Sequence, residues 1–210
     1  MKINKQNELR SIKRPLIWTL TDNRPGNNSQ VLGVAQYINY PFKRIKVTYN
    51  NFFFLRACLG NGSSIGFTRD SISLAEEPWP DLIISAGRRA AHFASWIKFH
   101  STVSTRLVSI MFPGRRIYNN FDILAIPKHD NIFNIKHCSK IIRINGAPSY
   151  ISDGILEQQK KQFSEIFNDF PKPLIAVLVG GDTKKYKYTM KDTYSFLNII
   201  SHFSESLNGT

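Results

Sequence analysis

A loop near the start of the chain combines residue types that bind anions and move protons. Asp22 and Arg24 precede a Pro25-Gly26 pair, which favours a tight turn, and Asn28 follows it. An arginine there can bind a phosphate or carboxylate through two hydrogen bonds, and Asp22 can orient a hydroxyl or act as a base. We therefore predict a catalytic Asp22 and a ligand-binding set of Arg24, Gly26, Asn28 and Gln30. The structural alternative is a turn in which Asp22 and Asn28 bond their own backbone.

A second candidate anion site is Gly87-Arg88-Arg89, which directly follows an apolar run and begins a predicted helix. Free backbone N–H groups at a helix start attract anions. Two arginines at this end of a helix cost stability, about 0.3–1 kcal/mol each when exposed, and a bound anion would offset that cost. We predict that Gly87, Arg88 and Arg89 bind phosphate. Arginines that instead reach surface carboxylates would fit the sequence equally well.

A third glycine-containing loop follows the apolar run 174–179 near the end of the chain. We predict phosphate binding by Gly180, Gly181, Lys185 and Tyr186, although Asp182 adds a negative charge to the same loop. The glycine pair has the spacing of neither a Walker loop nor a dinucleotide-binding fingerprint. A close turn between a strand and a helix is therefore the favoured alternative for this loop.

His129 is a second catalytic candidate because it stands beside Asp130. Neighbouring side chains point apart, so the pair is not a dyad by itself, and a loop histidine that holds the backbone is the default interpretation. The histidines lack the spacing of metal ligands, so we expect no metal site and no cofactor. The two cysteines, Cys58 and Cys138, form no C-x-x-C pair and are typical of free thiols in a reducing compartment.

Residues 49–55, with the sequence YNNFFFL, form a dense aromatic segment with basic residues on both sides. Three adjacent phenylalanines cannot all face inward from one helix, so partial exposure is expected. Such a segment could enter a membrane interface beside anionic headgroups. A role in the core or in a domain contact is the favoured alternative.

The elements that must position these loops alternate between apolar strands and helices. Strands are predicted at residues 15–20, 42–49, 81–86, 106–111, 121–126, 140–144 and 174–179, and helices at 52–59, 88–99, 153–168 and 191–207, with a further helix capped by Ser29. This pattern predicts an α/β fold, a Rossmann-like open parallel sheet with helices on both faces. Ligands of such sheets bind beyond the carboxyl ends of the strands.

The composition describes a globular, strongly basic chain. It has 210 residues, 42% hydrophobic and 12% aromatic, with a formal net charge of +13. The lysines are scattered and no reader motif is present, so phosphorylated small molecules or an anionic membrane surface are better candidates than specific nucleic acid. No run approaches the roughly 20 apolar residues that cross a bilayer, and the basic start lacks the apolar core of a secretory signal.

Four ordered motifs together resemble one family. They are residues 21–30, residues 79–90, residues 126–130, and residues 177–181 with Tyr186. They are similar to the "elongated mitochondria" fission family of plants and to its bacterial relatives, which are often labelled nucleoside-diphosphate-sugar epimerases. The resemblance extends over about residues 15–200.

The resemblance implies half of a GT-B glycosyltransferase-like fold, in which two Rossmann-like halves face a cleft that holds a nucleotide sugar. The implied domains are a basic tail at 1–14, a Rossmann-like domain at 15–170 and the start of an incomplete second domain at 171–210. Relatives continue well beyond the position of Thr210. This chain also differs from the family pattern in carrying Asp182 and Phe112.

Two functional interpretations follow from the resemblance. In the first, the chain binds a nucleotide sugar or another phosphorylated ligand but lacks the second half that catalysis needs. In the second, it is a non-catalytic adaptor that binds a protein partner or an anionic membrane, as the plant members are thought to do. We expect it in the bacterial cytoplasm, with peripheral membrane contact as an extension.

Overall fold

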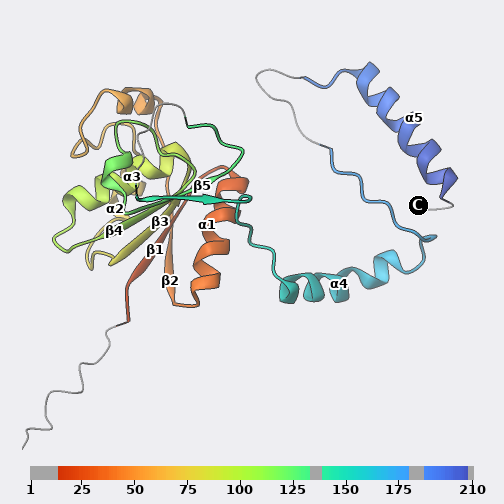
Figure 1. The fold of residues 1–210 in the computed structure, drawn as a ribbon, viewed down its shortest axis with the longest axis horizontal. Coiled ribbons are helices and arrows are strands. Elements are labelled where there is room, and N and C mark those ends of the chain that lie inside the picture. Colours follow the sequence, from red (N-terminus) through yellow and green to blue (C-terminus); the bar gives the residue numbers. More distant parts are fainter. Residues whose placement is uncertain (1–13, 133–138, 180–186, 208–210) are drawn as a thin grey trace, which may run out of the picture. The chain divides into compact units, whose positions relative to one another are not determined.

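The computed structural model describes residues 14–132, 139–179 and 187–207 of the chain (Figure 1). The chain divides into two compact units, Met1–Ile151 and Ser152–Thr210. Each unit is described by itself below. The domain limits predicted from the sequence stay a prediction.

A six-stranded, all-parallel sheet forms the centre of the first unit, with the strand order β2-β1-β3-β4-β5-β6. The strands are β1 (Ile17–Thr21), β2 (Phe42–Lys46), β3 (Leu82–Ala86), β4 (Arg106–Ile110), β5 (Ile123–Pro127) and β6 (Ile141–Ile144). All six coincide with predicted strands to within a few residues, and the predicted Rossmann-like α/β class is confirmed. Because the strands are parallel, their carboxyl ends meet at one edge of the sheet.

Helices α1 (Pro25–Ile38) and α3 (Gly87–His100) cover opposite faces of this sheet (Figure 1). On one face Ile17 and Ile84 form an apolar cluster with Val31 and Ala35 of α1. On the other face, the core contains alternate residues of the same strands and the inner side of α3. Its members include Trp18, Leu20, Ile83, Ala90, Phe93, Ala94 and Ile97. The strands are therefore buried on both faces, which is why they read as continuous apolar runs.

Helix α1 begins four residues before the predicted cap at Ser29, so that prediction is wrong. Pro25 occupies the first helical position, where its fixed φ suits the helix and its missing N–H costs nothing. The carbonyl of the extended residue Arg24 accepts a hydrogen bond from the backbone N–H of Asn28 at 3.1 Å. The Ser29 hydroxyl instead accepts a hydrogen bond from the backbone N–H of Tyr150.

Three short elements differ from the sequence-based expectation. The predicted helix at 52–59 is the 3₁₀-helix η1 (Asn51–Ala57), and a predicted loop contains the helix α2 (Arg69–Ser73). The Thr68 hydroxyl accepts a hydrogen bond from the backbone N–H of Ser71 and so caps α2. A second 3₁₀-helix, η2 (Tyr118–Asn120), precedes β5.

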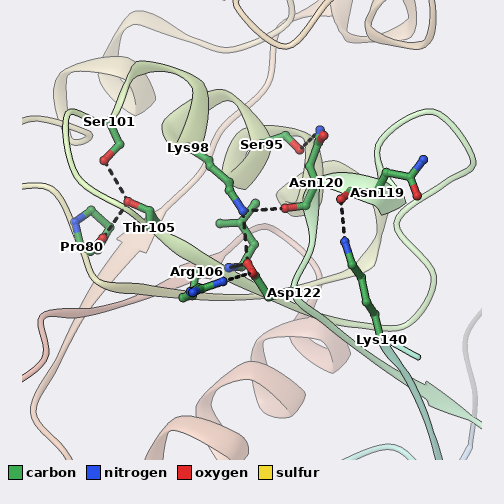
Figure 2. Close-up of polar contacts among 11 residues, drawn as sticks. Pro80, Ser95, Lys98, Ser101, Thr105, Arg106, Asn119, Asn120, Asp122 and Lys140 are labelled. Atoms are coloured by element: carbon green, nitrogen blue, oxygen red, sulfur yellow. Dashed lines mark hydrogen bonds and ion pairs between the residues drawn. The ribbon is translucent and has the colours of Figure 1, made fainter. Parts of the chain in front are cut away.

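Asp122 joins helix α3 to strand β4 (Figure 2). Its carboxylate lies 3.2 Å from Lys98 Nζ and 2.8 Å from Arg106 Nη1, and it accepts a hydrogen bond from the backbone N–H of Leu107 at 2.8 Å. Burial alone would raise the pKa of Asp122, but these three donors outweigh burial and lower the pKa to about 2. The carboxylate therefore stays ionised at neutral pH and links α3 to β4.

The second unit contains helices α4 (Asp153–Phe167) and α5 (Met190–Ser206). Ser152 caps α4 as predicted, and Thr189 with Asp192 forms a capping box at the start of α5. The prediction of a strand at 174–179 is wrong, because these residues form no strand and Leu178 is 96% exposed. An apolar run becomes a strand only when a neighbouring strand bonds its backbone, and no described residue does so here. None of the helices in the described ranges is long and apolar enough to cross a membrane.

Candidate functional site

Two cavities adjoin at the carboxyl edge of the sheet. The first has a volume of about 410 Å³ and is lined by Arg24, Phe53, Phe54, Arg56, Arg88, Arg89 and His92. The second has a volume of about 350 Å³ and is lined by Arg88, His92, Phe112, Gly114, Arg115, Arg116 and Ile117. We call the two together the arginine cleft. Its residues come from η1 and from the segments that follow β1, β3 and β4, which is where ligands of parallel sheets bind.

The loop after β1 is held by hydrogen bonds within itself. Asn28 Oδ1 accepts a hydrogen bond from the backbone N–H of Asp22 at 2.9 Å, and Asn28 Nδ2 donates to the Asp22 carbonyl at 2.8 Å. Asp22 Oδ1 accepts a hydrogen bond from the backbone N–H of Arg24 at 2.9 Å. These bonds match the structural alternative considered for the turn, and they also fix the position from which Arg24 reaches the first cavity.

One carboxylate oxygen of Asp22 remains buried without a partner among the described residues, as does the Tyr49 hydroxyl. Burial raises the pKa of Tyr49 well above its usual value, and the negative charge of Asp22 raises it further. Arg89 and Arg24 act in the opposite direction on the same pKa. These four side chains therefore share one electrostatic environment beside the first cavity.

Arg89 is positioned by aromatic rings. Its guanidinium carbon lies 5.4 Å from the ring centroid of Tyr49 and 5.7 Å from that of Phe53, within the range of cation–π contacts. The rings limit the conformations of this long side chain, so less entropy is lost when it binds a ligand. The aromatic segment thus contributes directly to the arginine cleft.

Arg56 is a buried arginine at the wall of the first cavity, with only 1% of its surface exposed. Its Nη1 donates to the carbonyl of Ser63, and its guanidinium lies 4.8 Å from the ring centroid of Phe67. Its Nε has no hydrogen-bond partner among the described residues. Burial lowers the pKa of Arg56. A buried cation with an unused donor is costly unless an anion binds it.

His92 lies one turn into α3 and lines both cavities. Burial lowers its pKa, and the positive charges of Arg56 and Arg88 act in the same direction, so that together they lower the pKa from 6.5 to about 4. The imidazole is therefore neutral at pH 7 and has one N–H to donate and one nitrogen to accept.

Arg88 and Gly114 bring the second cavity against the start of α3. Gly114 has a φ of +115°, and a Cβ built on it would lie 3.7 Å from Arg88 Nε. Gly87, with a φ of +75°, lies so close to Asn27 that a Cβ would be 2.8 Å from Asn27 Nδ2. The backbone conformation at Gly87 therefore favours glycine, whereas the amide end of Asn27 could move away from a Cβ.

Four arginines of the cleft lack an ion-pair partner among the described residues. Within the described part of the chain, no carboxylate lies within ion-pair distance of Arg24, Arg88, Arg89 or Arg116. Within these residues, Arg88 and Arg89 therefore do not form the pairs with surface carboxylates that the alternative requires. Unpaired arginines beside a helix N-terminus form an electrostatic environment that attracts phosphate.

The structure brings together three of the predicted ligand residues, Arg24, Arg88 and Arg89, in one cavity. Gly26 and Gln30 line neither cavity, although Gln30 has a buried side-chain oxygen without a described partner. The predicted residues Gly180, Gly181, Lys185 and Tyr186 lie outside the described residues. Their roles stay predictions.

His129 does not line the arginine cleft. Its side chain is 69% exposed, and its Nε2 lies 3.9 Å from Asp130 Oδ1. The catalytic roles of His129 and Asp22 stay predictions. No group of three potential metal-binding side chains occurs among the residues that the structure describes.

Four lining residues were missed by the sequence analysis: Arg56, His92, Arg115 and Arg116. Gly114-Arg115-Arg116 follows β4 just as Gly87-Arg88-Arg89 follows β3, so a repeated pattern of a glycine and two arginines could have revealed the second cavity. Arg56 and His92 had no such signal, because only the folded chain shows their burial.

The parallel sheet and the cleft at its carboxyl edge define a Rossmann-like α/β protein. The family model described as "Mitochondrial fission ELM1" matches residues 25–209. The chain therefore belongs to this family, as the four sequence motifs indicated.

One relative is the "Uncharacterized protein RP120" of Rickettsia prowazekii (strain Madrid E). The two sequences are 30% identical over an aligned length of 220 positions, and the alignment covers 88% of this chain and 59% of the relative. The chain thus spans about three-fifths of the length of the curated relative that it matches. No solved structure matches the chain.

Proposed function

We propose that the chain binds a phosphorylated ligand in the arginine cleft, and that a nucleotide sugar is the class of ligand suggested by the resemblance to GT-B enzymes. The observation that carries this proposal is the buried, incompletely bonded Arg56 beside Arg24, Arg88 and Arg89 in one cavity. Phosphate oxygens are suitable acceptors for such a set, since guanidinium groups bind them through paired hydrogen bonds.

The start of α3 supports the same proposal. Its first N–H groups have no partners within the helix, and the helix dipole favours negative charge there. Gly87 and Ala90 add no polar side chain, so the positive end of the helix is left to Arg88 and Arg89. No acidic residue occurs in the first turn of α3. Both the backbone and the side chains therefore favour an anion at this position.

Thermal shift and calorimetry with inorganic phosphate, a nucleoside diphosphate and a panel of nucleotide sugars test the proposal. A free ligand concentration of 100 times Kd should raise the free energy of unfolding by about 2.7 kcal/mol. Arg24→Ala and Arg89→Ala should weaken binding at least about tenfold, because each removes a charged donor. Arg69→Ala is the matched control, since Arg69 is exposed and lines neither cavity. Absence of binding by every phosphorylated compound would overturn the proposal.

A second candidate function is binding to an anionic membrane surface. Phe52 and Phe54 of η1 are 59% and 71% exposed, while Phe53 between them packs against the core. Exposed aromatic rings beside basic residues are typical of peripheral membrane proteins. A double Phe52→Ser, Phe54→Ser variant should lose sedimentation with anionic vesicles. If the wild-type protein does not sediment with them at low salt, this candidate is excluded.

A further inference from the structure

We propose that the arginine cleft recognises a diphosphate, with one phosphoryl group in each cavity and Arg88 between the two groups. This inference rests on the proposed function and specifies its ligand. It is carried by the division of the cleft into two cavities that share Arg88 and His92.

Each cavity has arginines of its own. Arg24, Arg56 and Arg89 line only the first cavity, and Arg115 and Arg116 line only the second. Arg89 is held over the Tyr49 and Phe53 rings, whereas Arg88 Nε lies near Gly114 of the β4 loop. Arg89 therefore lines the first cavity alone, whereas Arg88 reaches both cavities. A single phosphoryl group would contact the arginines of only one cavity.

The amount of positive charge also favours two linked anionic groups. In the first cavity Arg56 is buried, and its Nε has no hydrogen-bond partner among the described residues, so it is free to donate to an anionic ligand. In the second cavity Arg116 is exposed and has no carboxylate within ion-pair distance among the described residues. A diphosphate carries more charge than one phosphate and spans two neighbouring positions. The neutral imidazole of His92, at the boundary of the cavities, can donate to an oxygen of either group.

Diphosphates occur both in soluble nucleotides and on lipid carriers, and the recognised chemistry is the same in both. Exposed Phe54 lines the first cavity, so either source has an apolar surface beside its charged part. A nucleoside diphosphate in solution and a polyprenyl diphosphate in neutral vesicles separate the two sources. Binding of the vesicles alone identifies the lipid source, and binding of the nucleotide alone identifies the soluble source.

Calorimetry with inorganic phosphate, pyrophosphate and citrate tests the proposal. Pyrophosphate should bind at least about tenfold more tightly than phosphate, because it gains a second set of charged hydrogen bonds. Citrate, which also carries several negative charges, should bind no better than phosphate. The diphosphate proposal is wrong if pyrophosphate binds no more tightly than phosphate, or if citrate binds as tightly as pyrophosphate. In either case, measurable binding of phosphate still supports the proposed function. If none of the three binds and no nucleotide or nucleotide sugar binds either, the proposed function itself fails.

Two variants assign the two groups to the two cavities. Arg116→Ala should weaken pyrophosphate binding by a larger factor than phosphate binding. Arg24→Ala should weaken both ligands. Arg116 is exposed, so its variant is expected to fold, and Arg116→Gln with a circular-dichroism melt provides a second version. If both substitutions weaken both ligands by the same factor, there is a single anion position and the proposal is overturned.

Discussion

The side chain of Asn28 fastens the backbone of Asp22 at two points, accepting from its N–H at 2.9 Å and donating to its carbonyl at 2.8 Å. This amide thus replaces a missing strand partner at the point where β1 ends and the chain turns into α1. The turn in which Arg24 stands exists because of this contact. The conformation of the turn and the position of Arg24 are therefore coupled through one asparagine.

Asn28→Ala should lower the free energy of unfolding by about 1–3 kcal/mol, because it leaves two backbone groups of Asp22 without partners. The same change should weaken phosphate binding, since Arg24 loses its fixed turn. Urea denaturation and calorimetry measure the two effects. Asn23→Ala, at an exposed position of the loop between β1 and α1, is the control for stability. Unchanged stability in Asn28→Ala would show that the contact is dispensable.

Arg56→Met should separate binding from stability. Methionine keeps much of the apolar volume of the arginine but removes a buried charge whose Nε has no partner among the described residues. Replacement of a buried charge by an apolar side chain is often neutral or stabilising, so the free energy of unfolding should change by less than about 1 kcal/mol or rise. Phosphate affinity should nevertheless fall at least about tenfold.

Arg69→Met is the control for Arg56→Met because Arg69 is exposed and lines neither cavity. A large loss of stability in Arg56→Met with unchanged phosphate affinity would assign Arg56 a purely structural role. The opposite pattern is expected of a residue retained for its ligand.

The sequence was sufficient to predict the sheet and much of its carboxyl edge, because these depend on local patterns. The run 81–86 followed by Gly87 is apolar on both faces and ends at a glycine, and the structure has β3 and α3 there. Ser29 was a wrong cap because a polar residue was preferred over Pro25, although proline suits the first helical position.

Tertiary contacts account for what the sequence could not show. The run 174–179 is as apolar as a buried strand, yet strand formation needs a neighbour that local sequence does not reveal. Arg56 was noticed only as a charge beside an aromatic segment, since its burial under Ser63 and Phe67 depends on the folded loop. That Arg24, Arg88, Arg89 and Arg116 have no ion-pair partner among the described residues likewise becomes visible only when distances to carboxylates are known.

Asp122→Asn should destabilise the first unit by about 2 kcal/mol at neutral pH, since the pKa is lowered from 3.8 to about 2. A lowered pKa in the folded state means that this stability is present above pH 3.8 and is lost as the pH falls toward 2. Wild type and variant should therefore become equally stable near pH 2. Denaturation at a series of pH values measures the difference, and the exposed Asp169→Asn is the control. A difference that does not depend on pH would exclude this origin.

His92 should link ligand affinity to pH. The groups that face it are Arg56, Arg88 and the Phe53 ring, and its pKa is lowered from 6.5 to about 4. In the free protein this shift costs stability below pH 6.5, because the unfolded chain then binds the proton more readily than the folded chain. A bound anion favours the imidazolium and raises the pKa, so affinity should increase as the pH falls from about 6.5 to about 4. Sulfate is the suitable probe because it keeps its double charge over this range. Calorimetry should show proton uptake with wild type and none with His92→Gln; an equal pH dependence in both proteins would assign the effect to another group.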